Sequence, residues 1–446
     1  MTAQDLQAAR RKVLIVSPHF APINAPDMQR VRMALPYLRD NGWEPVVLAV
    51  SPESVEGGVL EPLLEGTYPA DIRIVRVKGI PARLTRLVGV GSLWWRCNRA
   101  LNKAGEKLLG CERFDLVFFS TTQFGAFSLG PRWKRKFGVP YVLDYQDPWI
   151  NEYYKNTGTR PPGGKLKFGI SQWSARRAEP KALRGASEVI AVSSAYGETL
   201  KKHYPWFDPK TVKFLPFGAS EADLAVARTH RPTDPVVDFD DGYIHHVYTG
   251  RCGPDMTTAL KILFRAFKHF LLLRPDEAKR IRFHFIGTDY APRPFGREWV
   301  IPTAAAEDVG AYVSECCYRV PYFDALYYLT RADALIAIGS NDPTYSASKI
   351  FSYVLARRPL LVVFHRDSPV LALANAMKCG QRYSFSGDKD VERVAVSVAE
   401  EWFGEGKMGQ LVEADLSAFF PYSAKSMTKE LAKSFDEALE AKASST

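Results

Sequence analysis

The sequence predicts an α/β protein with two Rossmann-like domains, on three observations. Short continuous apolar runs alternate with helix-length segments, which is typical of a mostly parallel sheet covered by helices. This alternation stops once, at a charged and proline-rich stretch, and then restarts. The chain has 446 residues, of which 46% are apolar and 24% charged, enough for two or three globular domains.

The first half of the chain supplies most of the expected strands. An apolar run at 12–17 predicts the first strand, and a polar loop leads from it to a helix from about Arg30 to Asn41, which Gly42 ends. These elements predict an amino-terminal Rossmann-like domain over residues 1–228. Further strands are expected at 43–50, 72–77, 116–120, 141–144, 189–192 and 212–215, with helices at 127–137 and ending near Arg184.

The second half repeats the plan after residues 229–241, whose prolines and charges are typical of a linker. Strands at 246–249, 281–286, 334–338 and 360–364 and a helix at 258–273 predict a second Rossmann-like domain over residues 242–405. Residues 406–446 include an amphipathic helix from Ser423 to Ala443, which we expect to pack back on the first domain. Two such domains would face a central cleft at the carboxyl ends of their strands.

Composition and charge narrow the classes of function. No stretch approaches the ~20 consecutive apolar residues needed to cross a bilayer. The amino terminus lacks the apolar region of a signal peptide, so we expect a cytoplasmic protein. The six cysteines show no zinc spacing and are interpreted as reduced, mostly structural thiols. The net charge of +10 favours an acidic partner, and without a nucleic-acid-binding motif a nucleotide diphosphate or an anionic membrane is a better candidate than nucleic acid.

The segment from Asp342 to Pro359 predicts an anion-binding site. Ser346, Ser348 and Lys349 stand at the start of an amphipathic helix, where unpaired amides and the helix dipole favour a diphosphate. Arg357 and Arg358 are expected in its last turn. The alternative is an ordinary capped surface helix.

Two further loops follow strands of the second half. Gly250 and Arg251 follow one strand, and Gly287 and Thr288 follow the next. The glycine would allow close approach of the backbone, and the guanidinium could pair with phosphate oxygens. The alternative for Arg251 is a surface ion pair.

Motifs along nearly the whole chain resemble one enzyme family. They include KVLIVSPHFAP at 12–22, VPYVLDYQDPW at 139–149, SEVIAVSSAYGETL at 187–200, LPFGAS at 215–220, VYTGR at 247–251, FHFIGTD at 283–289, RADALIAIGS at 331–340 and ASKIFSYVLARRPLL at 347–361. Their order and spacing resemble the family 4-like, group 1 glycosyltransferases of bacterial lipopolysaccharide and exopolysaccharide synthesis, which have the GT-B fold.

The resemblance implies a nucleotide-sugar donor on the second domain, an acceptor on the first, and no metal or other cofactor. Arg251 and Lys349 resemble the basic pair that neutralises the leaving diphosphate, with Ser348 donating to the same phosphates. The segment Arg319 to Tyr322, which includes Val320, resembles the loop that reads the base. Such a site stabilises the leaving group by preorganised donors.

Three positions depart from the family pattern. Many relatives have a histidine after the strand at 116–120, where this chain has Ser120 to Gln123. The lysine that commonly follows the Gly-Arg pair is missing from 252–258, and the glutamate that binds the donor ribose is replaced by Ser352. These departures concern donor identity and rate.

Three side chains of the first half are candidates for acid or base chemistry. Asp144 and Asp147 end a strand and could orient or deprotonate an acceptor hydroxyl. The alternative is turn chemistry, with Asp144 as a cap and Asp147 preceding a proline. His19 follows the first strand and could contact the acceptor or the donor phosphate, although a loop histidine is often only solvated.

Residues 83–107 interleave arginine and lysine with leucine and tryptophan. Such a stretch could lie on an anionic membrane near lipid-linked substrates. The alternative is a helix packed on the first domain with its basic face in solvent.

The predicted function is transfer of a sugar from a nucleotide diphosphate sugar to a glycan or lipid-linked glycan, with retention, in cell-envelope or exopolysaccharide synthesis at the inner membrane face. The alternatives are a sugar-nucleotide epimerase, which would need more acids and bases in the cleft, and a catalytically degenerate scaffold that binds nucleotide sugars.

Overall fold

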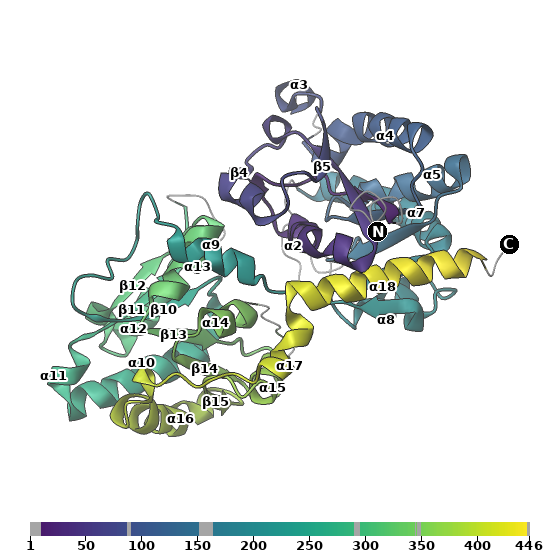
Figure 1. Ribbon diagram of the computed structural model, residues 1–446. Helices are drawn as coiled ribbons and strands as arrows, with labels where there is room; N and C mark the ends of the chain where they lie inside the picture. Colours follow the sequence, from purple (N-terminus) through teal and green to yellow (C-terminus); the bar gives the residue numbers. More distant parts are fainter. Residues whose placement is uncertain are drawn as a thin grey trace. The chain divides into compact units, whose positions relative to one another are not determined.

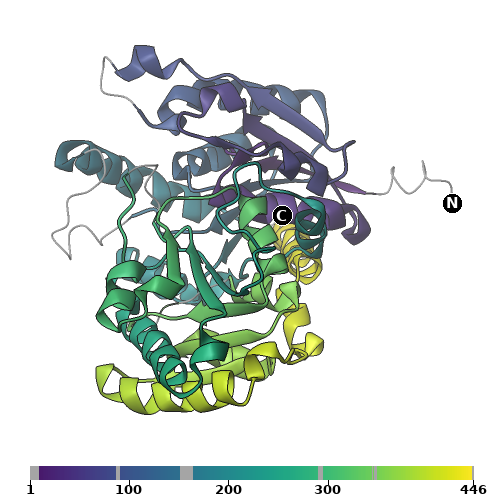
Figure 2. The same ribbon diagram turned by 90° about the vertical axis from the view of Figure 1, so that its left-hand side faces the viewer.

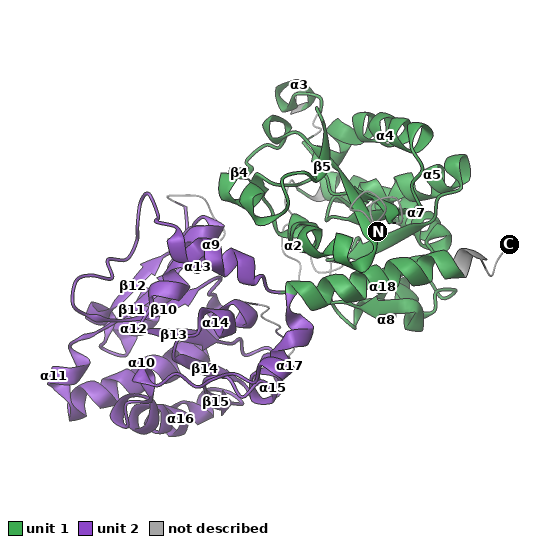
Figure 3. Cartoon of the chain, in the orientation of Figure 1, with its two compact units in different colours: residues 1–218, 424–446 green, residues 219–423 purple. Residues whose placement is uncertain are grey.

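The computed structural model describes residues 10–86, 91–150, 164–289, 295–343, 345 and 349–443. The chain, coloured along its sequence in Figure 1, forms two compact units (Figure 3). Unit 1 comprises residues 1–218 and 424–446, and unit 2 comprises residues 219–423. Both are α/β, as predicted from the alternation of strands and helices.

Unit 1 is built on a seven-stranded sheet with the order β5-β3-β1-β6-β7-β8-β9, in which every pair is parallel. Its strands are β1 (Arg11–Val16), β3 (Trp43–Val50), β5 (Arg73–Val77), β6 (Leu116–Ser120), β7 (Tyr141–Tyr145), β8 (Glu188–Ala191) and β9 (Val212–Phe214). Its helices are α2 (Gln29–Leu38), α3 (Ala82–Arg86), α4 (Leu93–Cys111), α5 (Leu129–Phe137), α7 (Lys165–Gly185), α8 (Tyr196–His203) and α18 (Ala424–Ala443). A short antiparallel pair, β2 (Ile23–Asn24) with β4 (Val59–Leu60), lies outside the main sheet.

The carboxyl-terminal helix α18 returns to unit 1, as predicted. It packs against α2, and the two helices lie side by side in Figures 1 and 2. The ring of Phe435 lies 5.2 Å from that of Trp43 and 5.0 Å from that of Phe118, measured between centroids. These contacts make α18 part of the hydrophobic core of unit 1.

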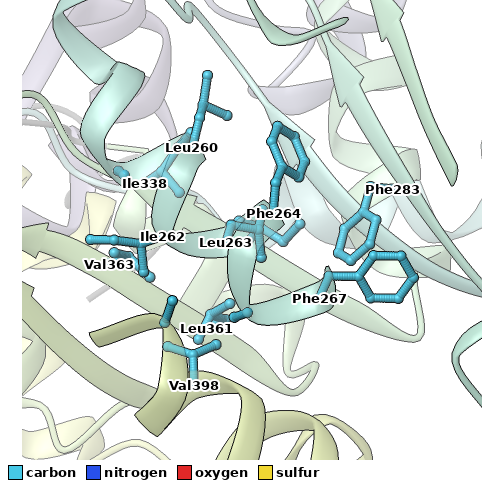
Figure 4. Close-up of a cluster of buried hydrophobic side chains, with 14 of the residues drawn as sticks. Leu260, Ile262, Leu263, Phe264, Phe267, Phe283, Ile338, Leu361, Val363 and Val398 are labelled. Carbon is cyan, nitrogen blue, oxygen red and sulfur yellow. The ribbon is translucent and has the colours of Figure 1, made fainter. Parts of the chain in front are cut away.

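Unit 2 is built on a six-stranded parallel sheet with the order β12-β11-β10-β13-β14-β15. Its strands are β10 (Ile244–Thr249), β11 (Ile281–Ile286), β12 (Val313–Cys316), β13 (Ala334–Ile338), β14 (Leu360–His365) and β15 (Gln381–Phe385). Its helices are α9 (Glu221–Thr229), α10 (Thr257–Leu273), α11 (Pro275–Ala278), α12 (Val300–Ala306), α13 (Tyr322–Arg331), α14 (Ile350–Ala356), α15 (Pro369–Ala376), α16 (Val391–Ser397) and α17 (Leu416–Phe419). Figure 4 shows the buried cluster where α10 meets the strands, with the rings of Phe264, Phe267 and Phe283 on one side of it.

The strand order indicates where a ligand would bind in each unit. In unit 1 the chain winds one way from β1 to β3 and β5 and the other way from β6 onward, so the order reverses between β1 and β6. In unit 2 the same reversal falls between β10 and β13. In open α/β sheets, ligands bind outside the carboxyl ends of the strands at such switch points.

The division into units differs from the predicted one. The first unit ends at Gly218 rather than at 228, and α9 belongs to unit 2. The predicted linker at 229–241 also belongs to unit 2, because Phe239 packs on Tyr327 and Tyr328 of α13. The composition resembles that of a linker, but the apolar side chains within it anchor the segment to a domain.

Among the residues that the structure describes, no helix is both long and apolar enough to cross a membrane. All six cysteines are free thiols, and four of them are buried.

Candidate functional site

The switch point of unit 2 begins at Gly250, directly after β10. This glycine has φ +123°, in the left-handed region that side chains disfavour, and a Cβ built on it would lie 3.2 Å from Nζ of Lys349. The turn therefore brings backbone, Arg251 and Lys349 together at one edge of the sheet. The two cations that the sequence analysis singled out therefore lie close to one another.

Lys349 directly precedes α14 and reaches back toward β10. Its Nζ donates to the hydroxyl of Tyr248 and lies 3.9 Å from the centroid of the Tyr248 ring. Burial lowers the pKa of Lys349 to about 7. The neighbouring positive charge of Arg251 acts in the same direction. An anion arriving here would restore the ammonium form, because an opposite charge favours ionisation.

Arg251 is held by a carboxylate that the sequence analysis missed. Its Nη1 and Nη2 donate to Oδ1 and Oδ2 of Asp255 at 2.9 and 2.7 Å. This two-point bond raises the pKa of Arg251 and lowers that of Asp255. The pair is about one-third exposed, so a phosphate could approach the guanidinium from solvent. The ion pair that was the alternative reading of Arg251 is therefore present.

The short helix α14 is fixed to the end of β10 by Tyr353. The Tyr353 hydroxyl donates to the carbonyl of Thr249 and accepts from its N–H, both at 3.0 Å.

The predicted positions of Arg357 and Arg358 in the last turn of α14 are wrong. Arg357 ends the helix with φ +53°, and Arg358 lies beyond it, donating to the carbonyl of Thr330.

Other predicted donor-site residues have partners inside unit 2. Gly287 has φ +74°, which suits glycine at the tight turn after β11. The hydroxyl of Thr288 donates to Glu315 at 2.7 Å, and Glu315 also accepts from the N–H of Val300 at the start of α12. Thr288 therefore holds the fold of this loop.

The predicted base-reading loop ends at the start of α13. Val320 and Tyr322 are half-buried there, and the Tyr322 hydroxyl donates to Asp223 of α9 at 2.7 Å. The loop is thus tied to a neighbouring helix. Ser346 and Ser348 lie outside the described residues. Ser352 is half-buried on α14.

The switch point of unit 1 contains a fully buried ion pair. Asp144 Oδ2 accepts from Nε of Arg30 at 2.8 Å, and both side chains have no exposed surface. Ser120 and Gln146 donate to the same oxygen. Because Asp144 has no exposed surface in this pair, a substrate hydroxyl cannot reach its carboxylate.

His19 is paired with a second carboxylate that the sequence analysis missed. Its Nδ1 lies 3.0 Å from Oδ1 of Asp27. Asp27 is buried and also accepts from Thr121 and from the N–H and hydroxyl of Thr122, beyond β6. Despite burial, these partners lower the pKa of Asp27, the bond to His19 being the first of them. A charged carboxylate on Nδ1 fixes the imidazole and leaves Nε2 as the ring atom that could act on a ligand.

Gln146 joins the carboxylate of Asp144 to the backbone of Asp27. Its Nε2 lies 3.0 Å from both the carbonyl oxygen of Asp27 and Oδ2 of Asp144. Asp147 follows it and is exposed, and the pKa of Asp147 is raised by partial burial and by the charge of Asp27. The buried charge of Asp27 therefore acts on both side chains. His19 is hydrogen-bonded to it, and its electrostatic field raises the pKa of Asp147.

A cavity of about 450 Å³ opens beside this cluster. Thr122 is shared by the cavity and the Asp27 network. The cavity lies between α4 and α7, and its wall combines aromatic faces with hydroxyl and amide groups. These include Trp94, Trp95, Asn98, Gln123, Trp149 and Ser174.

Residues 83–107 form α3 and most of α4, with 87–90 outside the described part. Helix α4 buries Leu93, Cys97 and Leu101 in the core of unit 1. Its basic residues Arg99 and Lys103 face solvent. Most of this stretch thus follows the alternative, a helix packed on the first domain.

Within the described residues, no group of three or more histidine, cysteine, aspartate or glutamate side chains is arranged to hold a metal ion.

Comparisons with known proteins give a family for part of the chain and a fold for the whole of it. Residues 28–218 match the family described as "Glycosyl transferase 4-like domain". HepE of Anabaena, solved with UDP-glucose, is similar over 95% of this chain and 99% of its own, at 14% identity and a TM-score of 0.55. A UDP-forming α,α-trehalose-phosphate synthase from Burkholderia vietnamiensis is similar over 95% of this chain and 99% of its own, at 12% identity and a TM-score of 0.56. Residues 28–218 therefore carry a glycosyl transferase 4-like domain, and the chain as a whole has the GT-B fold of these glycosyltransferases.

The resemblance seen in the sequence motifs is thereby confirmed at the level of family and fold. No curated protein sequence matches this glycosyltransferase. At these identities the solved structures establish the fold of the glycosyltransferase and leave its substrates to be argued from its own residues.

The geometry of this glycosyltransferase suits two tasks. Unit 2 offers two cations and a glycine turn at its switch point, which suits binding of a diphosphate leaving group. Unit 1 offers an oriented imidazole beside an aromatic and polar cavity, which suits binding of a hydroxylated acceptor.

Proposed function

We propose that this glycosyltransferase moves a sugar from a UDP-linked donor, held by unit 2, to a hydroxyl of a glycan or lipid-linked glycan held by unit 1. The observation that carries the proposal is the convergence of Gly250, Arg251 and Lys349 at the switch point of unit 2. The solved structures of HepE contain UDP-glucose or UDP, which supports UDP as the nucleotide.

The donor half would work by exchange of partners. A diphosphate would take the place of Asp255 as the partner of Arg251, or would bind Arg251 alongside it, because phosphate oxygens match the guanidinium fork as a carboxylate does. Lys349 would donate to the same diphosphate in its ammonium form. Both cations would then stabilise the charge that develops on UDP as the glycosidic bond breaks.

The acceptor half would use the cavity and His19. Indole faces bind sugar rings through apolar contact, and the hydroxyl and amide groups of the wall would pair with sugar hydroxyls. The Asp27 carboxylate fixes His19 so that Nε2 could accept a hydrogen bond from the attacking hydroxyl and orient it, and the proton of that hydroxyl would pass to the departing diphosphate on the same face of the sugar. Asp147 is the exposed carboxylate of the same region and would orient that hydroxyl.

Three finer points belong to the proposal. Retention of configuration, a role in cell-envelope or exopolysaccharide synthesis, and a cytoplasmic place at the inner membrane face follow from the resemblance of the sequence motifs. The same resemblance implies a reaction without a metal ion. Full activity after dialysis against a chelator, with no gain on adding Mg²⁺ or Mn²⁺, is the expected result, and loss restored by either ion would contradict it.

A donor screen tests the proposal. Thermal shift and hydrolysis are measured with UDP-, GDP-, ADP-, CMP- and dTDP-sugars. The expected result is stabilisation by a UDP-sugar that is lost in Arg251→Ala and Lys349→Ala. Lys261→Ala is the matched control, because Lys261 pairs with Asp388 away from the switch point.

The other outcomes separate the alternatives. Binding without sugar release or transfer, even with membrane extract as acceptor, would support a degenerate scaffold. Conversion of the donor into its epimer would support an epimerase. No stabilisation by any donor would contradict the assignment of the site.

A further inference from the structure

Helix α7 of unit 1 carries an apolar stripe on its solvent side. Leu166, Ile170 and Trp173 are 79%, 56% and 57% exposed. Their spacing of four and three residues places them on one face of the helix. Isolated exposed apolar side chains are ordinary, but three in line on one face mark an interaction surface.

The stripe is distinct from the two faces of α7 that already have a role. Ala175, Glu179 and Ala182 are buried in unit 1. Ser171 and Ser174 line the cavity together with Trp95 of α4. At 100° per residue, the stripe lies about 120° from the cavity-lining face. It serves neither the core nor the cavity wall.

Basic groups surround the stripe. The guanidinium carbon of Arg177 lies 4.0 Å from the Trp173 ring centroid. Helix α7 contains six lysine and arginine residues and one acid, Glu179. That glutamate is buried and accepts from the hydroxyls of Tyr145 and Tyr204. The exposed charge of α7 is therefore positive.

Helix α4, on the other side of the cavity, has the same character. Trp95 is 51% exposed and Arg99 and Lys103 are exposed near it. The one acid of α4, Glu106, pairs with Arg132 and Lys136. Two helices that border one cavity thus present tryptophan and a net positive charge.

We propose that the face formed by Leu166, Ile170, Trp173 and the basic residues around them binds an anionic lipid bilayer. An interfacial helix places its apolar side chains below the headgroups and its basic groups on the phosphates, with tryptophan at the boundary. The stacked Arg177–Trp173 pair matches this boundary. A second copy of the chain fits less well, since pairing this face with itself would oppose two sets of like charges.

The proposed membrane contact lies on a different helix from the one that the sequence predicted. Residues 83–107 were predicted to supply it, whereas the line of three exposed apolar side chains lies on α7. Since α4 and α7 border the cavity, the proposed contact would bring the cavity to the lipid surface. The conclusion that the acceptor is lipid-linked rests on the proposed function, but membrane binding itself does not.

Vesicle flotation of the full chain tests the proposal. Vesicles of an equal mixture of phosphatidylcholine and phosphatidylglycerol should bind the protein, and vesicles of phosphatidylcholine alone should bind it much more weakly. The double variant Ile170→Ser, Trp173→Ser should lower the partition coefficient about tenfold or more. Added salt should weaken binding of the wild type.

Leu272→Ser, Leu273→Ser is the matched control, because these two leucines are also highly exposed but belong to unit 2. Equal binding by the stripe variant and the control variant would overturn the proposal. A concentration-dependent dimer that the stripe variant abolishes, without vesicle binding, would assign the face to self-association instead. Thermal shift with UDP-glucose is measured on every variant, so loss of donor binding is separated from loss of membrane binding.

Discussion

The switch points of the two units differ in how their charges are paired. In unit 1 the carboxylates of Asp144 and Asp27 are buried, and each accepts several hydrogen bonds from its own unit. In unit 2 the cations Arg251 and Lys349 are partly buried, and within the described part of the chain they have one carboxylate partner between them, that of Asp255.

This difference separates two uses of the same topology. A buried network of several hydrogen bonds favours one arrangement, because each lost bond leaves a costly unpaired group. A partly exposed cation with a single carboxylate partner can exchange it for a ligand. Unit 1 thus holds a side chain in place, and unit 2 keeps its charges accessible.

The largest expected effect is on the stability of unit 1. Asp144→Ala should lower the free energy of unfolding by about 3–5 kcal/mol, because Arg30 would remain buried without its partner. Urea denaturation followed by tryptophan fluorescence measures the change. Asp71→Ala is the control, since its pair with Arg39 lies nearer the surface and should contribute no more than about 1 kcal/mol. Equal losses of unfolding free energy in both variants would show that the buried pair of unit 1 stabilises the fold no more than a pair nearer the surface.

The next effect concerns turnover. His19→Ala should slow sugar transfer roughly a hundredfold or more while leaving donor binding unchanged, because the oriented imidazole acts on the acceptor. Steady-state rates and donor titrations measure the two quantities separately. His269→Ala, which removes a surface histidine paired with Glu392, should change neither. Wild-type turnover in His19→Ala would leave the pair with Asp27 a purely structural role.

A smaller effect is expected for the donor site. Lys349→Ala should weaken UDP binding about ten- to a hundredfold and leave uridine binding unchanged, because a charge-assisted bond to phosphate is lost. Calorimetric titration measures both ligands, with Lys261→Ala as the control. Equal weakening for UDP and uridine would remove Lys349 from the phosphate site.

The smallest effect is a pH dependence of donor affinity. The pKa of Lys349 is about 7 in the free protein, and a bound diphosphate would raise it. Below about pH 7 the ammonium is already present, so this group adds no slope. As the pH rises above that value, binding must take up a proton, and affinity for a UDP-sugar should fall severalfold. Lys349→Arg should remove the slope, and an unchanged slope in that variant would assign it to another group.

Most of the fold could be predicted because the central strands are continuous apolar runs. The strand expected at 43–50 is β3, and that expected at 116–120 is β6. The edge strands β12 and β15 were not predicted. Only some of their residues are buried, so polar side chains interrupt the apolar run that marks a strand.

The site was predictable only where one loop carries the signal. Gly250 and Arg251 are adjacent, and the four-residue spacing of Arg251 and Asp255 would have revealed their pair. Asp27 had no such signal. It meets Thr121 across 94 residues, a contact that depends on β1 and β6 being neighbours in the sheet.

Because α18 follows unit 2 in the chain, the ribosome completes unit 2 before it releases the helix that covers Trp43 and Phe118. We expect nascent unit 1 to remain incompletely packed until α18 emerges, so that unit 2 becomes protease-resistant first although its synthesis begins later. Chains stalled with Ser423 just outside the exit tunnel would show this as selective cleavage within residues 10–218. Joining α18 to the amino terminus by circular permutation should reverse the order.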